Sequence, residues 1–98
     1  MRVNFTFRNM DSSEGMKNYA EDKVSRLQKF LRVPLDAEIT FSTERHLHCI
    51  DVNLNADGKR FAGHEESEDM YASIDLVMDK INRQVRDAND AQRAKRRS

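Results

Sequence analysis

Residues 69–85 have the sequence DMYASIDLVMDKINRQV, and this stretch carries the clearest structural pattern in the chain. Its large apolar side chains recur at three- and four-residue spacing, which is typical of an α-helix that docks on a core through one face. The members of this apolar stripe are Met70, Ile74, Val77, Met78, Ile81 and Val85. The opposite side of the predicted helix carries Arg83 and Arg86, with Lys80 on its flank. One side of this helix is therefore expected to build the core while the other presents positive charge.

The length and composition of the chain indicate one small domain. A chain of 98 residues is large enough for a single core and too small for two. No apolar run is long enough to cross a bilayer, and the first residues alternate in polarity where a signal peptide would be continuously apolar. Cys49 is the only cysteine, which fits a reducing compartment. We therefore expect a cytoplasmic protein.

The charges are segregated along the chain, although the formal net charge is zero. Acidic residues outnumber basic ones between residues 36 and 75, and the balance reverses from Asp79 to the end. A local field of one sign steers a polyanion to one face even when the total charge is near zero. The charge distribution therefore indicates more about binding than the sum does.

The rest of the chain alternates between strand and helix patterns. Polarity alternates with a period of two in four segments, which predicts strands at residues 2–8, 37–42, 48–54 and about 59–65. A first helix is predicted from the capping residues 11–13 to about Leu31, because Pro34 stops it soon afterwards. Asp57-Gly58 predicts a tight hairpin turn, and the second helix is expected to end near Ala88.

The predicted order is β-α-β-β-β-α, an α+β fold. Both helices have one apolar stripe and all four strands have one apolar face. The economical arrangement is two helices packed side by side on one face of a four-stranded sheet, with the other face open to solvent. The domain is expected to span residues 1–88. Residues 89–98 form a basic tail without large apolar side chains, which we expect to be frayed or disordered.

The sequence gives little support for catalysis. There is no Gly-rich phosphate loop, no nucleophile motif and no Cys/His pairing at metal-ligand spacing. His48 and Cys49 are adjacent in a predicted strand, so they point to opposite faces and do not join His46 and His64 in a metal cluster. We interpret these residues as ordinary strand and turn residues. The sequence predicts no enzyme, no metal site and no cofactor.

The cationic faces of the two helices are the better candidate for a site. If the helices are neighbours, basic residues at three-residue spacing on each helix line a common groove. Lys and Arg suit phosphates by charge, and Arg adds a fork that grips two oxygens. The alternative is two solvated faces, with carboxylates such as Asp79 paired to arginines of the same helix. The candidate residues for binding RNA or another polyanion on these faces are Lys23, Arg26, Lys29, Lys80, Arg83 and Arg86.

A family resemblance covers about residues 2–88. Residues 69–75, DMYASID, are followed by Asp79-Lys80-Ile81 and Arg83-Gln84. This run resembles the second-helix signature of the short ribosome hibernation promoting factors and the ribosome-associated translation inhibitor, which reads DMYAAID, then DKL and RQ. The N-terminal half agrees more loosely; its matching positions are Arg2-Val3-Asn4-Phe5, Asn9, Ser13-Glu14 and the stretch from Lys23 to Leu27.

The resemblance implies a non-catalytic protein with the same β-α-β-β-β-α order, a fold like that of double-stranded-RNA-binding domains. Members of the family bind the small ribosomal subunit in the channel between its head and body and contact ribosomal RNA through basic residues of both helices. The positions here that match this basic surface, and that the resemblance predicts to bind RNA, are Lys23, Arg26, Lys29, Lys80, Arg83 and Arg86. They block translation by occluding the sites of mRNA, tRNA and initiation factors. The implied partners are the small ribosomal subunit and its ribosomal RNA, with no membrane and no small-molecule substrate. The sequence does not distinguish a factor that promotes ribosome dimers with a separate ribosome-dimerising protein from one that only silences single ribosomes.

One departure from the family pattern affects the second helix. Family members continue with more lysines after the position of Arg86, whereas this chain has Asp87-Ala88-Asn89-Asp90. Its remaining cations are displaced to Arg93, Lys95, Arg96 and Arg97, so binding is expected to be weaker there or to depend on the tail. The alternative function is a non-ribosomal protein-interaction module, such as a sigma-factor modulator, that binds a basic protein through the acidic sheet face.

Overall fold

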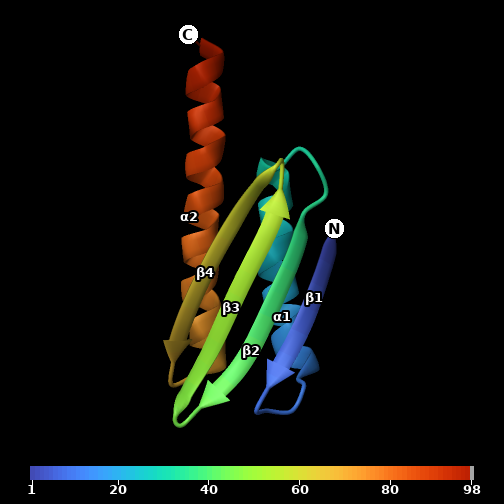
Figure 1. Ribbon diagram of the computed structural model, residues 1–98, viewed down its shortest axis with the longest axis vertical. Coiled ribbons are helices and arrows are strands. Elements are labelled where there is room, and N and C mark those ends of the chain that lie inside the picture. The colour runs from blue at the N-terminus through green and yellow to red at the C-terminus, as the bar shows by residue number, and fades with distance from the viewer. Residues whose placement is uncertain (98) are drawn as a thin grey trace.

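The computed structural model describes the backbone of residues 1–97 and the side chains of residues 1–91. Its elements are β1 (Arg2–Arg8), α1 (Glu14–Ser25), the 3₁₀ helix η1 (Arg26–Phe30), β2 (Asp36–Glu44), β3 (Leu47–Ala56), β4 (Lys59–Ser67) and α2 (Met70–Arg97). The strands form one four-stranded sheet, and both helices lie on the same face of it (Figure 1). The predicted β-α-β-β-β-α fold is confirmed.

The strands lie in the sheet in sequence order. β1 pairs with β2 in parallel, whereas β2–β3 and β3–β4 are antiparallel hairpins. A parallel pair needs a crossover connection, which α1 and η1 supply here. Ala56 pairs with Lys59 across the second hairpin, leaving a two-residue loop in which Asp57 and Gly58 have φ angles of 55° and 72°. Positive φ at both positions is what the predicted tight turn requires.

The core lies between the inner face of the sheet and the two helices. Most inward-facing side chains of β2 and β3 are buried, and those of Phe41 and Ile50 are completely buried. The whole predicted apolar stripe of α2 is buried against them. Gly63 on β4 permits a close approach, because a Cβ atom there would lie 3.1 Å from Val77 Cγ2 and 3.5 Å from Ile81 Cδ1.

The first helix is shorter than the sequence predicted. α1 ends at Ser25, and the chain continues as η1 instead of extending in α-helical form to about Leu31. The Gln28 side chain contributes to this tighter winding. It donates to the Val33 carbonyl oxygen at 2.8 Å and accepts from the Leu35 amide at 2.9 Å. These bonds draw the chain toward β2, and a 3₁₀ turn is a common way to end a helix under such a constraint.

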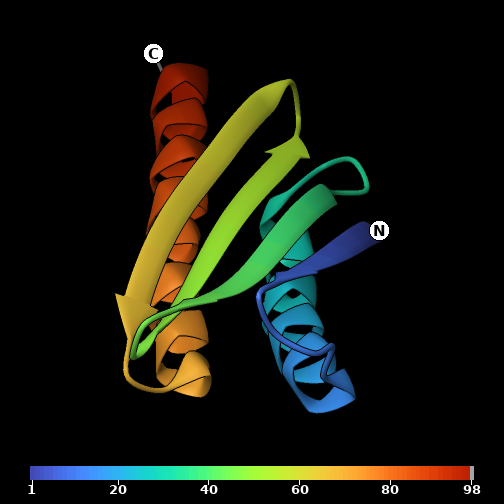
Figure 2. The same cartoon turned by 60° about the horizontal axis from the view of Figure 1, so that its bottom comes forward.

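The helical backbone of α2 extends further than the sequence indicated. It continues to Arg97, whereas fraying or disorder was expected from residue 89 onward. This segment is rich in Ala, Arg, Lys and Gln, which have high helix propensity, so its backbone is compatible with a helix beyond the core. Figures 1 and 2 show α2 projecting past the end of the sheet. The domain boundary at residue 88 stays a prediction. The cationic side chains of the tail lie outside the described residues; they are Arg93, Lys95, Arg96 and Arg97.

Replacing Ile81 by Asp is expected to unfold the domain, whereas Arg83→Ala should leave it folded. Ile81 is 0 % exposed, and an unpaired buried carboxylate there costs roughly 4–5 kcal/mol or more, most of the stability of a small domain. Arg83 is exposed on the same helix and serves as the matched control. Thermal melts followed by circular dichroism provide the measurement. Equal melting temperatures for the two variants would contradict the helix register.

Candidate nucleic-acid interface

A hollow lies between the two helical segments. α1 and η1 contribute Lys23, Arg26, Leu27, Lys29 and Phe30, and α2 contributes Met78, Asp79, Asn82 and Arg86. Four of the six predicted RNA-binding residues are therefore brought together although they are far apart in sequence. These four are Lys23, Arg26, Lys29 and Arg86.

Local sequence signals position the α1 side of this hollow. Ser13 caps the helix, because its Oγ accepts from the Met16 amide at 3.2 Å. Val24 and Leu27 are buried three residues apart, which anchors the inner side of the segment. Lys23 and its neighbours at three-residue spacing therefore lie along the side next to α2, as helical periodicity predicts.

A second hollow continues along α2 and shares part of the same wall. It is lined by Asp79, Asn82, Arg83, Arg86, Asp87 and Asp90. We call the two hollows together the groove. Its α1–η1 side is cationic, whereas its α2 side mixes two arginines with three carboxylates. A polyanion would therefore meet its most favourable field near the α1–η1 side and Arg86.

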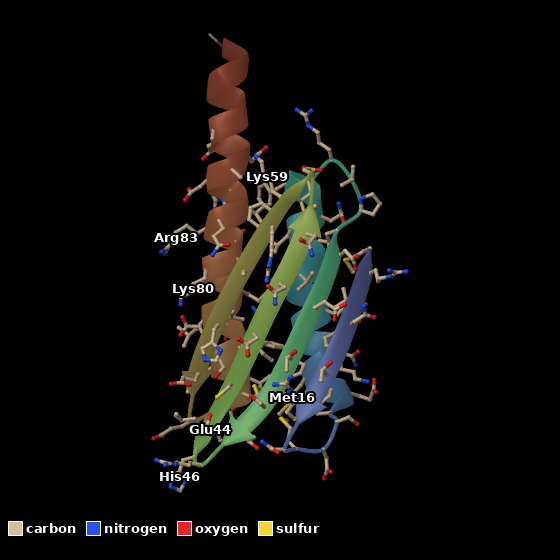
Figure 3. The ribbon with its side chains drawn as sticks, viewed as in Figure 1. Met16, Glu44, His46, Lys59, Lys80 and Arg83 are labelled. Atoms are coloured by element: carbon tan, nitrogen blue, oxygen red, sulfur yellow. The ribbon has the colours of Figure 1, made fainter. Side chains whose placement is uncertain are left out.

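Lys80 does not line the groove. It lies on the β4 side of α2, where its Nζ contacts the Glu65 carboxylate and donates to the His64 carbonyl oxygen at 3.3 Å. Figure 3 shows Lys80 and Arg83 projecting from α2 on the side away from α1, so Arg83 reaches only the outer part of the groove. Arg86 follows Lys80 by six residues, so the two side chains point to different sides of the helix. The sequence pattern alone did not show which of the two would face α1.

The exposed arginines of the groove are weakly engaged. Arg26 pairs with Asp22 at 2.7 Å, and both side chains are more than half exposed, so this pair is worth only about 0–1 kcal/mol. In the described part of the chain, neither Arg83 nor Arg86 has a carboxylate within ion-pair distance. The pair between Asp79 and Arg83 that the solvated-face interpretation requires is therefore not formed. These arginines can engage phosphates without first giving up a strong partner.

Asp75 joins the two helices at one end of the groove. It accepts a hydrogen bond from the Tyr19 hydroxyl at 2.7 Å and pairs with Lys23 Nζ at 3.1 Å. The Tyr19 ring packs edge-on against Tyr71, with ring centroids 5.1 Å apart. Lys23 is therefore already neutralised by a carboxylate and contributes less to phosphate binding than its neighbours on the ridge.

The pKa values in this cluster follow from the same contacts. The hydrogen bond from Tyr19 lowers the pKa of the Asp75 carboxyl, and the bond to Asp75 raises the pKa of Tyr19. Contact with Asp75 also raises the pKa of Lys23, which stays a cation. Sequence reasoning missed this cluster. Tyr19, beside the apolar stripe of the first helix, and Asp75, at the end of the DMYASID run, were the available signals.

The outer face of the sheet is separate from the groove and carries carboxylates such as Asp51 and Glu66. His64 Nδ1 lies 2.8 Å from Asp51 Oδ1, and this contact raises the pKa of the imidazole. Cys49 lies in the same face but is buried, and burial raises the pKa of its thiol, so it is not an activated nucleophile. Among the described residues, no group of three or more His, Cys, Asp or Glu side chains is arranged to hold a metal ion.

Within the described residues, no helix is both long enough and apolar enough to span a membrane.

The fold and the groove define a small α+β domain that carries lysines and arginines between two helices on one face of a sheet. The family described as "Sigma 54 modulation protein / S30EA ribosomal protein" matches residues 3–93. This chain belongs to that family, which confirms the resemblance inferred from residues 69–84.

Named relatives and solved structures agree with this assignment. A ribosome hibernation promoting factor from Azotobacter vinelandii is 32% identical over 85 residues, covering 87% of this chain and 79% of the relative. One from Klebsiella oxytoca is 31% identical, covering 87% and 90%. The N-terminal domain of Protein Y from Thermus thermophilus has a TM-score of 0.82 at 26% identity, covering 87% and 96%. A ribosomal subunit interface protein from Coxiella burnetii shares the fold, with a TM-score of 0.79 at 23% identity, covering 92% and 99%.

Replacing Asp75 by Asn is expected to lower the melting temperature at neutral pH. The amide keeps the shape but loses the charge that holds Lys23, and because the pair is partly exposed the loss should stay below about 1 kcal/mol. The folded-state pKa of Asp75 lies below its unfolded value. Its stabilisation is therefore complete above the unfolded pKa and is lost as the pH falls through the folded pKa. Melts across a pH series should begin to converge for the two proteins as the pH falls below about 4, and should coincide only below the lowered folded-state pKa.

Asp79→Asn is the matched control for this measurement. Asp79 lies one turn further along α2 and is exposed, and it forms no ion pair in the described part of the chain. Its substitution should leave the pH dependence of stability unchanged. If the melting difference caused by Asp75→Asn stayed constant into acid, the charge on Asp75 would not be what joins the helices.

Proposed function

We propose that this protein is a ribosome hibernation factor that binds ribosomal RNA of the small subunit through the groove. By occupying the channel it would occlude the sites of mRNA, tRNA and initiation factors, and so block translation in the cytoplasm. The observation that carries this proposal is the convergence of Arg26, Lys29 and Arg86 on one groove, in a chain whose relatives are named ribosome hibernation promoting factors. No reaction is required, because the protein acts by occupying space.

The proposed contacts are mainly electrostatic. Arginine and lysine side chains form charge-assisted hydrogen bonds with phosphate oxygens, and an extended charged surface releases the counterions of the RNA. Because the net charge of the chain is zero, this attraction is local to the groove and does not favour every polyanion equally. Of the six predicted RNA-binding residues, Lys23, Lys80 and Arg26 already contact carboxylates, and only in the Arg26 pair are both side chains more than half exposed, so that pair is easily exchanged for a phosphate. We therefore assign the main contacts to Arg26, Lys29, Arg83 and Arg86.

The shape of the domain is compatible with this role. Its extents are 51 × 22 × 17 Å, so it is an elongated body with α2 along its length. A body of this kind fills a channel with a rigid core, because the sheet and both helices share one cluster of buried side chains. The acidic residues of the α2 side would orient it by keeping phosphates toward α1 and η1.

A second candidate function is a protein-interaction module of the sigma-factor-modulating kind. The open face of the sheet carries the carboxylates of Glu38, Asp51 and Glu66, and the description of the family includes sigma 54 modulation. An acidic face of this kind would suit a basic protein partner. In this case the groove would not be needed for binding.

Co-sedimentation with small ribosomal subunits across a salt series tests the proposed function. Four phosphate contacts predict a loss of roughly a hundredfold in affinity between about 50 and 200 mM salt. We expect the protein to sediment with the small subunit at low salt and to be released as salt rises. Binding that does not respond to salt would contradict a phosphate-binding groove.

Charge reversal separates the groove from the rest of the surface. The double variant Arg26→Glu, Arg86→Glu should lose ribosome binding and translation inhibition, because two contacts become repulsive, while circular dichroism stays unchanged. The matched control is Arg2→Glu, Arg8→Glu, which changes the net charge equally on exposed positions of β1. The control should still bind. If the groove variant still bound ribosomes and the control variant did not, the interface would have to lie on the sheet side.

Neutralising Lys80 provides a finer comparison within the same helix. Lys80→Gln removes a cation that is already held by Glu65 outside the groove. Ribosome binding should therefore fall much less than in Arg86→Gln, although both variants lose one charge from α2. Equal losses would show that the total charge of the helix, and not the groove, controls binding. Both affinities come from the same sedimentation measurement.

A further inference from the structure

The inner end of the groove has an apolar floor beneath its cationic rim. Leu27 and Met78 are 4% and 5% exposed, and Phe30, which lines the same hollow, is half-buried. Arg26 and Arg86 stand at the rim of the same hollow. A surface that met only phosphates would not need this floor, because phosphate oxygens are strongly hydrated and gain little from apolar contact.

We propose that this hollow takes one unpaired nucleotide of the RNA, with its base against Phe30 and its flanking phosphates on Arg26 and Arg86. We call it the base pocket and define it by Arg26, Leu27, Phe30, Met78, Asn82 and Arg86. The inference rests on the proposed function and deepens it, since it names what the groove recognises besides phosphate.

The Phe30 ring is partly exposed and lines the hollow. Lys29 Nζ lies over the ring at 5.2 Å from its centroid, and the Lys29 side chain is exposed. A cation–π contact at an exposed site is weaker than the stacking of a base on an aromatic ring, so an incoming base displaces the ammonium. The Lys29 ammonium then lies beside the phosphates, which its positive charge attracts. A base and Lys29 therefore do not compete for the same final position.

Polar groups at the α2 wall suit the edge of a base. The Asn82 amide is half-buried, and within the described residues it has no hydrogen-bond partner although it can both donate and accept. Side-chain amides and carboxylates pair with the donor and acceptor groups of base edges, and Asp79 lies next to Asn82 on this wall. Asp79 also repels phosphates, which directs the backbone of the nucleotide toward Arg26. Asp79, although it is acidic and lies in a cationic groove, would thereby help to orient the nucleotide.

The chemistry selects unpaired RNA over duplex RNA. Bases in an A-form helix are stacked and paired, so none of them can enter a hollow between two protein helices. A nucleotide in a loop, bulge or single-stranded segment can turn its base toward Phe30 while its phosphates stay on the rim. The groove would then bind a specific kind of RNA segment and not merely a dense array of phosphates.

Two short RNA oligomers of equal length test the base pocket. One is a single-stranded oligoadenylate, and the other has the same ribose-phosphate backbone without bases. Fluorescence anisotropy at low salt gives both affinities for the full-length protein. We expect the oligomer with bases to bind about tenfold more tightly, the gain typical of one stacked base. Equal affinities, or no binding of either oligomer, would overturn the base pocket.

Matched variants locate the base dependence. Phe30→Leu keeps an apolar side chain but removes the ring, so it should abolish most of the tenfold preference and leave the affinity for the base-free oligomer unchanged. Phe61→Leu is the control, because it makes the same change in the core outside the groove. Asn82→Ala, at a half-exposed position, should also reduce the preference and does not depend on core packing. A preference that survives both Phe30→Leu and Asn82→Ala would place the base elsewhere.

The outcome is separable from that of the proposed function. The two oligomers could bind equally while the double variant Arg26→Glu, Arg86→Glu still loses ribosome binding. That result would contradict the base pocket and support the phosphate-binding groove. If the wild-type protein fails to sediment with ribosomes, the proposed function falls whatever the oligomers do. A base preference that is lost in Phe30→Leu, together with salt-sensitive ribosome binding, supports both.

Discussion

The close packing of α2 on the inner face of β4 determines where the polar side chains of residues 75–90 lie. Gly63 has no side chain, so Val77 and Ile81 approach the strand directly, and the apolar stripe settles in one register. Once that register is set, Asp75 and Arg86 face α1, whereas Lys80 faces β4. The candidate interface is therefore a consequence of core packing. A rotation of α2 would exchange the groove residues for a different set of charges.

Much of the fold could be predicted from the sequence because its signals are local. The period of the apolar stripe ending at Val85 and the Asp57-Gly58 turn depend only on neighbouring residues, and the structure has both as expected. The break between α1 and η1 was missed. It depends on hydrogen bonds from Gln28 to residues further along the chain, which leave no periodic trace in the sequence.

The site was predicted less completely, for a related reason. Helical spacing places a residue on a side of its own helix, but it does not say which neighbour that side meets. Arg26 and Arg86 therefore converge as expected, while Lys80 at the same kind of spacing turns to Glu65 on β4. The cluster of Tyr19 and Asp75 joins residues far apart in sequence and has no local signature. Tertiary contacts, and not charge alone, decide which cations are available.

The contacts between α2 and β4 also affect how the sheet meets other chains. The Gln84 amide donates to the carbonyl oxygen of Ala62 at 2.8 Å and accepts from its N–H at 3.1 Å, and Lys80 donates to the carbonyl oxygen of His64. These side chains occupy backbone groups that would otherwise template an additional strand. The middle of the outer edge of β4, from Ala62 to His64, is thus blocked against edge-to-edge association. β1 is the other edge strand, so an additional strand, including one added in the first step of aggregation, would have to pair there. The charges of Arg2 and Arg8 at the two ends of β1 disfavour such pairing.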